Sequence, residues 1–209
     1  MKNNLLILLS AMVISFTADA KDQQWDFDVL LGDSKIGEHS FVVTNTDGQQ
    51  SVSINASFKV ELLFMTVYQY QHKNTEKWKS GCVNELISKT NDDGKEYSVY
   101  VKQNNNLSIS VNGEAKQETI SCIRSFSYWD KKITTSNQLI NSQTGEIVPV
   151  AFRLVGNESY EVKGESLLSK RYEMKTDKFT MQLWYSASDD WLGLSSVTED
   201  GHELRYILR

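Results

Sequence analysis

A strict alternation of apolar and polar residues most constrains how this chain can fold. From Val52 to Val60 the even positions are apolar or small, whereas the odd positions from Ser51 to Lys59 are polar. Successive side chains of a β-strand point to opposite faces, so a period of two is typical of a strand with one buried face. Comparable patterns cover residues 25–31, 97–101, 107–111, 179–185, 191–197 and 202–208. We therefore predict an all-β chain.

Short turn sequences separate the predicted strands, namely Gly32-Asp33, Asp47-Gly48, Asp93-Gly94, Asn112-Gly113, Gly156-Asn157 and Asp200-Gly201. Such short connections favour antiparallel pairing of neighbouring strands. About ten strands in one domain indicate a single antiparallel sheet that is barrel-like or strongly curved. Residues 128–146 lack the alternation, and we expect this irregular segment to hold at most a short helical turn.

The first twenty residues have the pattern of a secretory signal peptide. Lys2 precedes an apolar run from Leu5 to Phe16, and Ala18-Asp19-Ala20 provides small residues for cleavage. This run of twelve residues, broken only by Ser10 and Ser15, is too short to span a bilayer comfortably. We therefore expect cleavage after Ala20, export to the periplasm, and a single β-rich domain at residues 21–209.

Composition excludes several classes of protein. The chain has 27 acidic and 22 basic residues and no basic cluster, which argues against nucleic-acid binding. No second apolar run reaches membrane length, and an outer-membrane barrel would not mix His, Asn and Glu into its most aromatic strand face. An integral membrane protein is therefore not expected. No metal-ligand spacing, phosphate-binding loop or nucleophile motif occurs, so we predict no cofactor and no metal.

Two cysteines, Cys82 and Cys122, are present. In an oxidising compartment they form the one available pair, so we predict a disulfide bond. A redox or metal site is the alternative, but the chain has no CxxC spacing.

The strand at residues 68–78 carries the clearest functional signal. Its odd positions are polar, whereas its even positions combine three aromatic side chains with an imidazole, an amide and a carboxylate: Tyr68, Tyr70, His72, Asn74, Glu76 and Trp78. Buried polar groups need hydrogen-bonding partners, so this face is unusual for a core. His72 and Glu76 are about 13 Å apart along a strand and cannot touch each other.

The other two histidines also share strand faces with apolar residues. His39 has the parity of Phe41, and His202 has the parity of Leu204 and Tyr206. One interpretation is three separate hydrogen-bonded histidines in the core or at its rim, which we prefer. The other is convergence on one internal polar site.

Three functional hypotheses follow. The first is that the concave interior binds a lipid-like or other apolar or amphipathic small ligand, and that the site is lined by Tyr68, Tyr70, His72, Glu76, Trp78 and His39. The second is a hydrolase-type enzyme that uses His72 or His39 as general base and Glu76 as its partner. The third is a non-catalytic envelope assembly factor that acts through the apolar stretch Leu62–Met65.

The connection between the two best-patterned strands is itself unusual. Even parity continues from Val52 to Trp78, so either the turn has an odd length or one long strand bends. The stretch Glu61–Val67 contains none of the usual turn residues. We expect it to pack inward, and the alternative is an exposed rim that contacts a ligand or partner.

The chain also resembles a family of bacterial exported proteins classified as a domain of unknown function. The residues that carry the resemblance are Tyr68-x-Tyr70-x-His72-x-x-x-Glu76-x-Trp78, Ser125-Phe126-x-Tyr128-Trp129 and Asp200-Gly201-x-x-Leu204-Arg205-Tyr206-x-Leu208. The resemblance implies a curved, barrel-like antiparallel fold and no established activity. His202 stands where this family is expected to have Arg, which leaves His39 and His72 as the better site candidates.

Overall fold

The computed structural model describes residues 22–46, 48–62, 65–198 and 201–209. The predicted signal peptide, residues 1–20, lies outside these ranges. The first half of the described chain contains β1 (Gln23–Leu31), β2 (Ser34–Thr46), β3 (Gln49–Leu62), β4 (Met65–Lys79), β5 (Cys82–Asp92), β6 (Lys95–Gln103), β7 (Leu107–Val111) and β8 (Glu114–Glu118). The last part contains β12 (Ala151–Val162), β13 (Glu165–Lys175), β14 (Thr180–Ser186), β15 (Trp191–Val197) and β16 (Glu203–Leu208).

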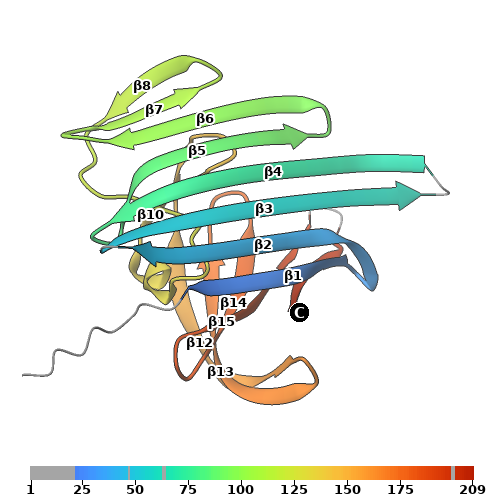
Figure 1. Ribbon diagram of the computed structural model, residues 1–209. Coiled ribbons are helices and arrows are strands. Elements are labelled where there is room, and N and C mark those ends of the chain that lie inside the picture. The colour runs from blue at the N-terminus through green and yellow to red at the C-terminus, as the bar shows by residue number, and fades with distance from the viewer. Residues whose placement is uncertain (1–21, 47, 63–64, 199–200) are drawn as a thin grey trace, which may run out of the picture.

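All of these strands belong to one antiparallel sheet of thirteen strands. The last strand, β16, pairs with the first, β1, so the order runs from β12 through β16 and β1 to β8. β8 and β12 are the two ends of the sheet, and it does not close into a barrel. In Figure 1 the strands β1 to β6 form a broad curved layer, and β12 to β15 run behind it. The predicted all-β, strongly curved antiparallel fold is confirmed, with more strands than the ten expected.

The predicted burial of alternate residues is also confirmed. On β1, Trp25, Phe27 and Val29 are buried, and on β3 the same holds for Val52 and Ile54. Several predicted two-residue turns connect the strands. Both residues of the Asp93-Gly94 and Asn112-Gly113 turns have positive φ angles, the conformation that lets a tight turn follow the twist of a hairpin.

The predicted turn at Gly156-Asn157 is wrong. These residues lie inside β12, where the register shifts between Leu154 and Gly156. The chain instead reverses at Lys163-Gly164, which have φ angles of 53° and 80°. β12 and β13 extend over mixed polar and apolar sequence and contain few buried residues, so neither has the clean alternation that would reveal its ends.

The connection between β3 and β4 is a hairpin with a bulge. Leu62 pairs with Met65, and a register shift next to Val60 leaves one extra residue on β4. Without the bulge, an even-numbered residue would face an odd-numbered one. The extra residue brings even-numbered residues of β3 opposite even-numbered residues of β4. Residues 63 and 64 lie outside the described ranges.

The expected inward packing of this connection is wrong for Met65 and Val67, which are 64% and 50% exposed. Pairing of β3 with β2 ends at Phe58, and pairing of β4 with β5 begins at Tyr70. The hairpin tip is therefore a two-stranded ribbon beyond the neighbouring strands, and it has no core to pack against.

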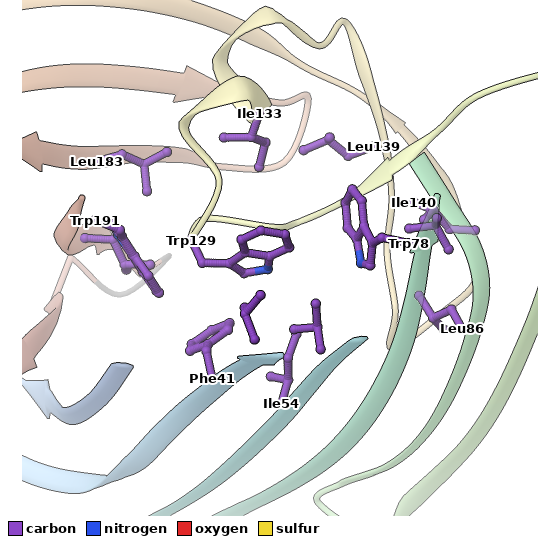
Figure 2. Close-up of a cluster of buried hydrophobic side chains, with 14 of the residues drawn as sticks. Phe41, Ile54, Trp78, Leu86, Trp129, Ile133, Leu139, Ile140, Leu183 and Trp191 are labelled. Carbon is purple, nitrogen blue, oxygen red and sulfur yellow. The ribbon is translucent and has the colours of Figure 1, made fainter. Parts of the chain in front are cut away.

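The segment between β8 and β12, residues 119–150, fills the concave side of the sheet; we call it the inner segment. It contains β9 (Arg124–Ser125), the 3-10 helix η1 (Lys131–Thr135), β10 (Gln138–Ile140) and β11 (Ile147–Pro149), and its strands form a separate small sheet. Figure 2 shows its apolar side chains between those of the two halves of the large sheet. The buried residues it supplies include Ile123, Trp129, Ile133, Leu139 and Ile140.

This arrangement explains why the sequence at residues 128–146 is irregular. The segment changes direction several times as it crosses the concave face, so its buried residues follow no single period along its length. The expected short helical turn is present as η1. No helix among the described residues is long and apolar enough to cross a membrane.

The predicted disulfide bond joins Cys82 and Cys122, whose Cα atoms are 5.3 Å apart. It connects the start of β5 to the start of the inner segment. Next to it, the backbone N–H of Val83 donates to the carbonyl oxygen of Ile123 at 2.9 Å. The disulfide therefore fixes the start of the inner segment to the start of β5.

Candidate functional site

Two of the three histidines converge on the concave face of the sheet. His39 pairs with Ala56, and Ala56 pairs with His72, so the two histidines occupy one row across β2, β3 and β4. Neighbouring strands are about 4.8 Å apart, which places the two Cα atoms about 10 Å from each other. For these two histidines the structure agrees with convergence and not with the preferred interpretation of separate histidines.

His202 does not join them. It is exposed and precedes β16, in a turn where its backbone N–H donates to the hydroxyl of Thr198 at 3.1 Å. The expectation that it shares an apolar face with Leu204 and Tyr206 is wrong, because pairing with β15 begins only at Glu203.

His72 is 5% exposed and has a hydrogen-bonding partner on each ring nitrogen. Its Nδ1 lies 2.7 Å from Thr90 Oγ1, and its Nε2 lies 3.2 Å from Ser142 Oγ in the inner segment. The Thr90 hydroxyl is buried and has no other acceptor among the described residues, so it donates to Nδ1. The Nε2–H then donates to Ser142. In this tautomer His72 cannot take a proton from the Ser142 hydroxyl.

His39 differs because one of its ring nitrogens lacks a partner. Its ring stacks on Phe41, with 4.3 Å between centroids, and its Nδ1 lies 3.1 Å from the hydroxyl oxygen of Tyr206. That hydroxyl is buried and has no other acceptor in the described chain, so it donates to Nδ1. The Nε2–H is therefore a buried donor with no acceptor among the described residues, an arrangement that destabilises a fold.

Both histidines are neutral at pH 7. Burial lowers the pKa of His72 from 6.5 to about 4. Burial, and secondarily the nearby His72, lower the pKa of His39 to about 3. Neither ring supplies a positive charge to the site.

Acidification is expected to destabilise the fold through these histidines. A depressed folded pKa contributes stability that is present above the unfolded pKa of 6.5 and is lost as the pH falls toward the folded value. For His72 this loss amounts to about 3 kcal/mol by pH 4. Urea unfolding of the wild type and of His72→Gln at pH 7 and pH 4 measures it. His202→Gln is the exposed control, and equal acid losses in wild type and His72→Gln would contradict the prediction.

A hydrogen-bond network holds the inner segment against β4 and β5. The Tyr68 hydroxyl donates to Asp92 at 2.8 Å, and the Gln143 amide donates to the other oxygen of the same carboxylate at 3.0 Å. The Tyr70 hydroxyl donates to the Gln143 side-chain oxygen at 3.1 Å. Burial raises the pKa of both tyrosines, so they remain neutral donors. The network fixes the turn that carries Ser142 over His72.

A cavity of about 170 Å³ lies beside the two histidines. One wall is the sheet, which contributes His39, Phe41, Ile54, Tyr70 and His72. The opposite wall comes from the inner segment and the turn before β14, and it includes Phe126, Tyr128, Asn141, Ser142, Gln143 and Phe179. The cavity therefore combines an aromatic lining with a few polar groups, as small-molecule sites commonly do.

Three of the six residues predicted to bind a ligand line this cavity: His39, Tyr70 and His72. Tyr68 is not among the lining residues, and its hydroxyl instead donates to Asp92 in the hydrogen-bond network. The residues that sequence reasoning missed are Ser142 and Gln143 and the aromatic Phe126, Tyr128 and Phe179. No spacing relates these positions to His72, because they reach it through the path of the inner segment.

Glu76 and Trp78 lie further along β4, where the inner segment covers them. The Glu76 side chain is fully buried and accepts hydrogen bonds from Asn74 Nδ2 at 2.7 Å, Trp78 Nε1 at 2.7 Å and Ser125 Oγ at 3.0 Å. Trp78 packs edge-on against Trp129, with 5.4 Å between centroids. Glu76 and Trp78 are therefore not part of the cavity lining, and they anchor the inner segment to the sheet.

The geometry also disagrees with the hydrolase hypothesis. Glu76 contacts neither histidine, because its oxygens are bonded to Asn74, Trp78 and Ser125. Within the described residues, no group of three or more His, Cys, Asp or Glu side chains is placed to hold a metal ion.

Comparison with known proteins places the chain in a family. Residues 27–209 match the family model DUF6134, described as a domain of unknown function, and the chain belongs to this family. No curated protein sequence matches the chain. A crystal structure of a β-barrel-like protein of the domain of unknown function DUF1849 from Brucella abortus is similar, with a TM-score of 0.65 and 8% sequence identity. The match covers 89% of this chain and 94% of that chain, and it shows the fold alone.

Proposed function

We propose that this DUF6134 protein binds a small amphipathic ligand in the cavity between β2–β5 and the inner segment. The observation that carries the proposal is the lining of this cavity, which brings the polar side chains of His72, Ser142 and Gln143 together with aromatic rings. A polar group of the ligand would meet these side chains. The aromatic rings of Tyr70, Phe126 and Phe179 would contact the apolar part of the ligand.

We also propose that the protein acts in the periplasm. The signal-peptide pattern of residues 1–20 supports export. The disulfide between Cys82 and Cys122 is compatible with an oxidising compartment.

The other two hypotheses have weaker support. General-base catalysis would require a different tautomer of His72 and a partner other than Glu76. The exposed Met65 and Val67 fit a rim that contacts another protein, but the described residues do not indicate the chemistry of such a partner. Ligand binding is therefore the function that the geometry supports best.

Filling the cavity is expected to weaken ligand binding about tenfold. The test titrates the full chain, purified after export, with the fluorescent amphiphile N-phenyl-1-naphthylamine. Ser142→Leu places a larger side chain in a 170 Å³ space, whereas Ser53→Leu makes the same change at an exposed position of β3. We expect saturable binding by the wild type and by Ser53→Leu. The absence of saturable binding in the wild type, or unchanged affinity in a folded Ser142→Leu variant, would refute the proposal.

A further inference from the structure

A second, larger hollow of about 500 Å³ lies next to the cavity at the histidines. It is lined by β8, the inner segment and the turn before β14, where the large sheet is not closed. Its apolar lining includes the half-buried Ile120, Ile147 and Val148. This outer hollow was not expected from the sequence, because its walls come from three separate parts of the chain.

The two spaces share walls. Phe126, Asn141 and Phe179 line both the inner cavity and the outer hollow. The rings of Phe126 and Phe179 are 6.4 Å apart between centroids, and Phe179 is 37% exposed. The two rings therefore form an apolar boundary that faces both spaces.

The outer hollow and the inner cavity differ in their charged side chains, and this difference restricts the charge that a ligand can carry. At the outer hollow, Lys116 Nζ lies 3.4 Å from Glu118 and Lys178 Nζ lies 3.6 Å from Glu146. The described lining of the inner cavity contains no lysine or arginine. An anionic group would be buried there without a cationic partner, which is costly, whereas a neutral oxygen needs only a donor.

From these observations, which rest on the proposed function, we infer that the ligand is an elongated single-chain amphiphile with an uncharged polar end. The polar end lies beside Asn141, Ser142 and Gln143, which are polar side chains of the inner cavity. The apolar chain passes along Phe126 and Phe179 into the outer hollow, against Ile120, Ile147 and Val148. Straight-chain alcohols are the simplest probes of this class.

The test measures displacement of N-phenyl-1-naphthylamine from the full chain by 1-hexanol, 1-octanol, 1-decanol and decanoate at pH 8. We expect affinity to rise about two- to fourfold per added methylene. Decanoate should bind at least about tenfold more weakly than 1-decanol, because its charge has no partner. This series uses the unmodified protein and does not depend on the folding of any variant.

Variants then locate the two ends of the ligand. Val148→Trp fills the outer hollow and should remove the advantage of 1-decanol over 1-hexanol, whereas Val197→Trp, at an exposed site on β15, should not. Ser142→Ala removes a polar group of the inner cavity and should weaken every alcohol about fivefold. Ser53→Ala, at an exposed position on β3, is its control.

The outcomes separate the two proposals. If 1-hexanol displaces the probe but chain length has no effect, the elongated ligand is refuted and the proposed function stands. Tighter binding of decanoate than of 1-decanol refutes the uncharged polar end. If neither the probe nor any alcohol binds, the proposed function fails and this inference fails with it.

Discussion

Replacing both Cys82 and Cys122 with serine is expected to lower the free energy of unfolding by about 4 kcal/mol. The bridge spans 40 residues, and closing a loop of that length removes a corresponding amount of entropy from the unfolded chain. The two side chains lie near the surface, so serine itself costs little in the folded state. The disulfide also holds the inner segment at its entry into the concave face.

Urea unfolding of the double variant and of the wild type measures this loss. Wild-type protein unfolded in the presence of a reductant is the matched control, and it should behave like the double variant. A difference of less than about 1 kcal/mol between the oxidised wild type and the double variant would contradict the prediction.

Glu76→Ala is expected to destabilise the fold by about 4 kcal/mol, because it leaves three buried donors, on Asn74, Trp78 and Ser125, without their acceptor. Glu76→Gln should keep most of the stability at pH 7. Its side-chain oxygen accepts from Trp78 and Ser125, and its amide donates to Asn74 Oδ1, which has no partner among the described residues. Reorientation of the Asn74 amide makes this pairing possible.

The pH dependence separates the charge of Glu76 from its hydrogen bonds. Burial raises the pKa of this carboxyl above 4.5, although the three donors oppose the shift. A raised folded pKa contributes stability that is complete below 4.5 and is lost as the pH rises through the folded value. We therefore expect the Glu76→Gln variant to gain stability relative to the wild type as the pH rises above 4.5.

Urea unfolding of the wild type and Glu76→Gln from pH 4 to pH 9 provides the measurement. The contributions of His39 and His72 have the opposite pH dependence, but they are common to both proteins and cancel in the difference. Parallel stability curves over this range would show that Glu76 is not held in a raised-pKa environment. Glu61→Gln, at an exposed position on β3, is the matched control.

Part of the site was predictable because it lies on regular strands. Parity alone places Tyr70 and His72 on one face of β4 and His39 on the inner face of β2. The alternation of residues between the two faces of a strand does not show how far along the strand the cavity extends. It grouped Glu76 and Trp78 with His72, although Ser125 and Trp129 cover that part of the face.

The opposite wall of the cavity was not predictable. Ser142 reaches His72 across 70 residues of sequence, and Phe179 reaches Phe126 from the turn before β14. These contacts depend on the path of the inner segment, which has no regular repeat. The bulge near Val60 similarly leaves the parity of β3 and β4 unchanged, so the sequence does not reveal its position.

The all-β fold, the buried face of the patterned strands and the pairing of the two cysteines could be predicted from the amino-acid sequence. These features follow from local periodicity and from there being two cysteines to pair. The tertiary structure alone decided that the sheet stays open, that the inner segment fills it, and that His39 and His72 share a cavity while Glu76 is an anchor. The physical reason is that an open curved sheet must cover its concave face with apolar groups, and the position of that cover depends on long-range packing.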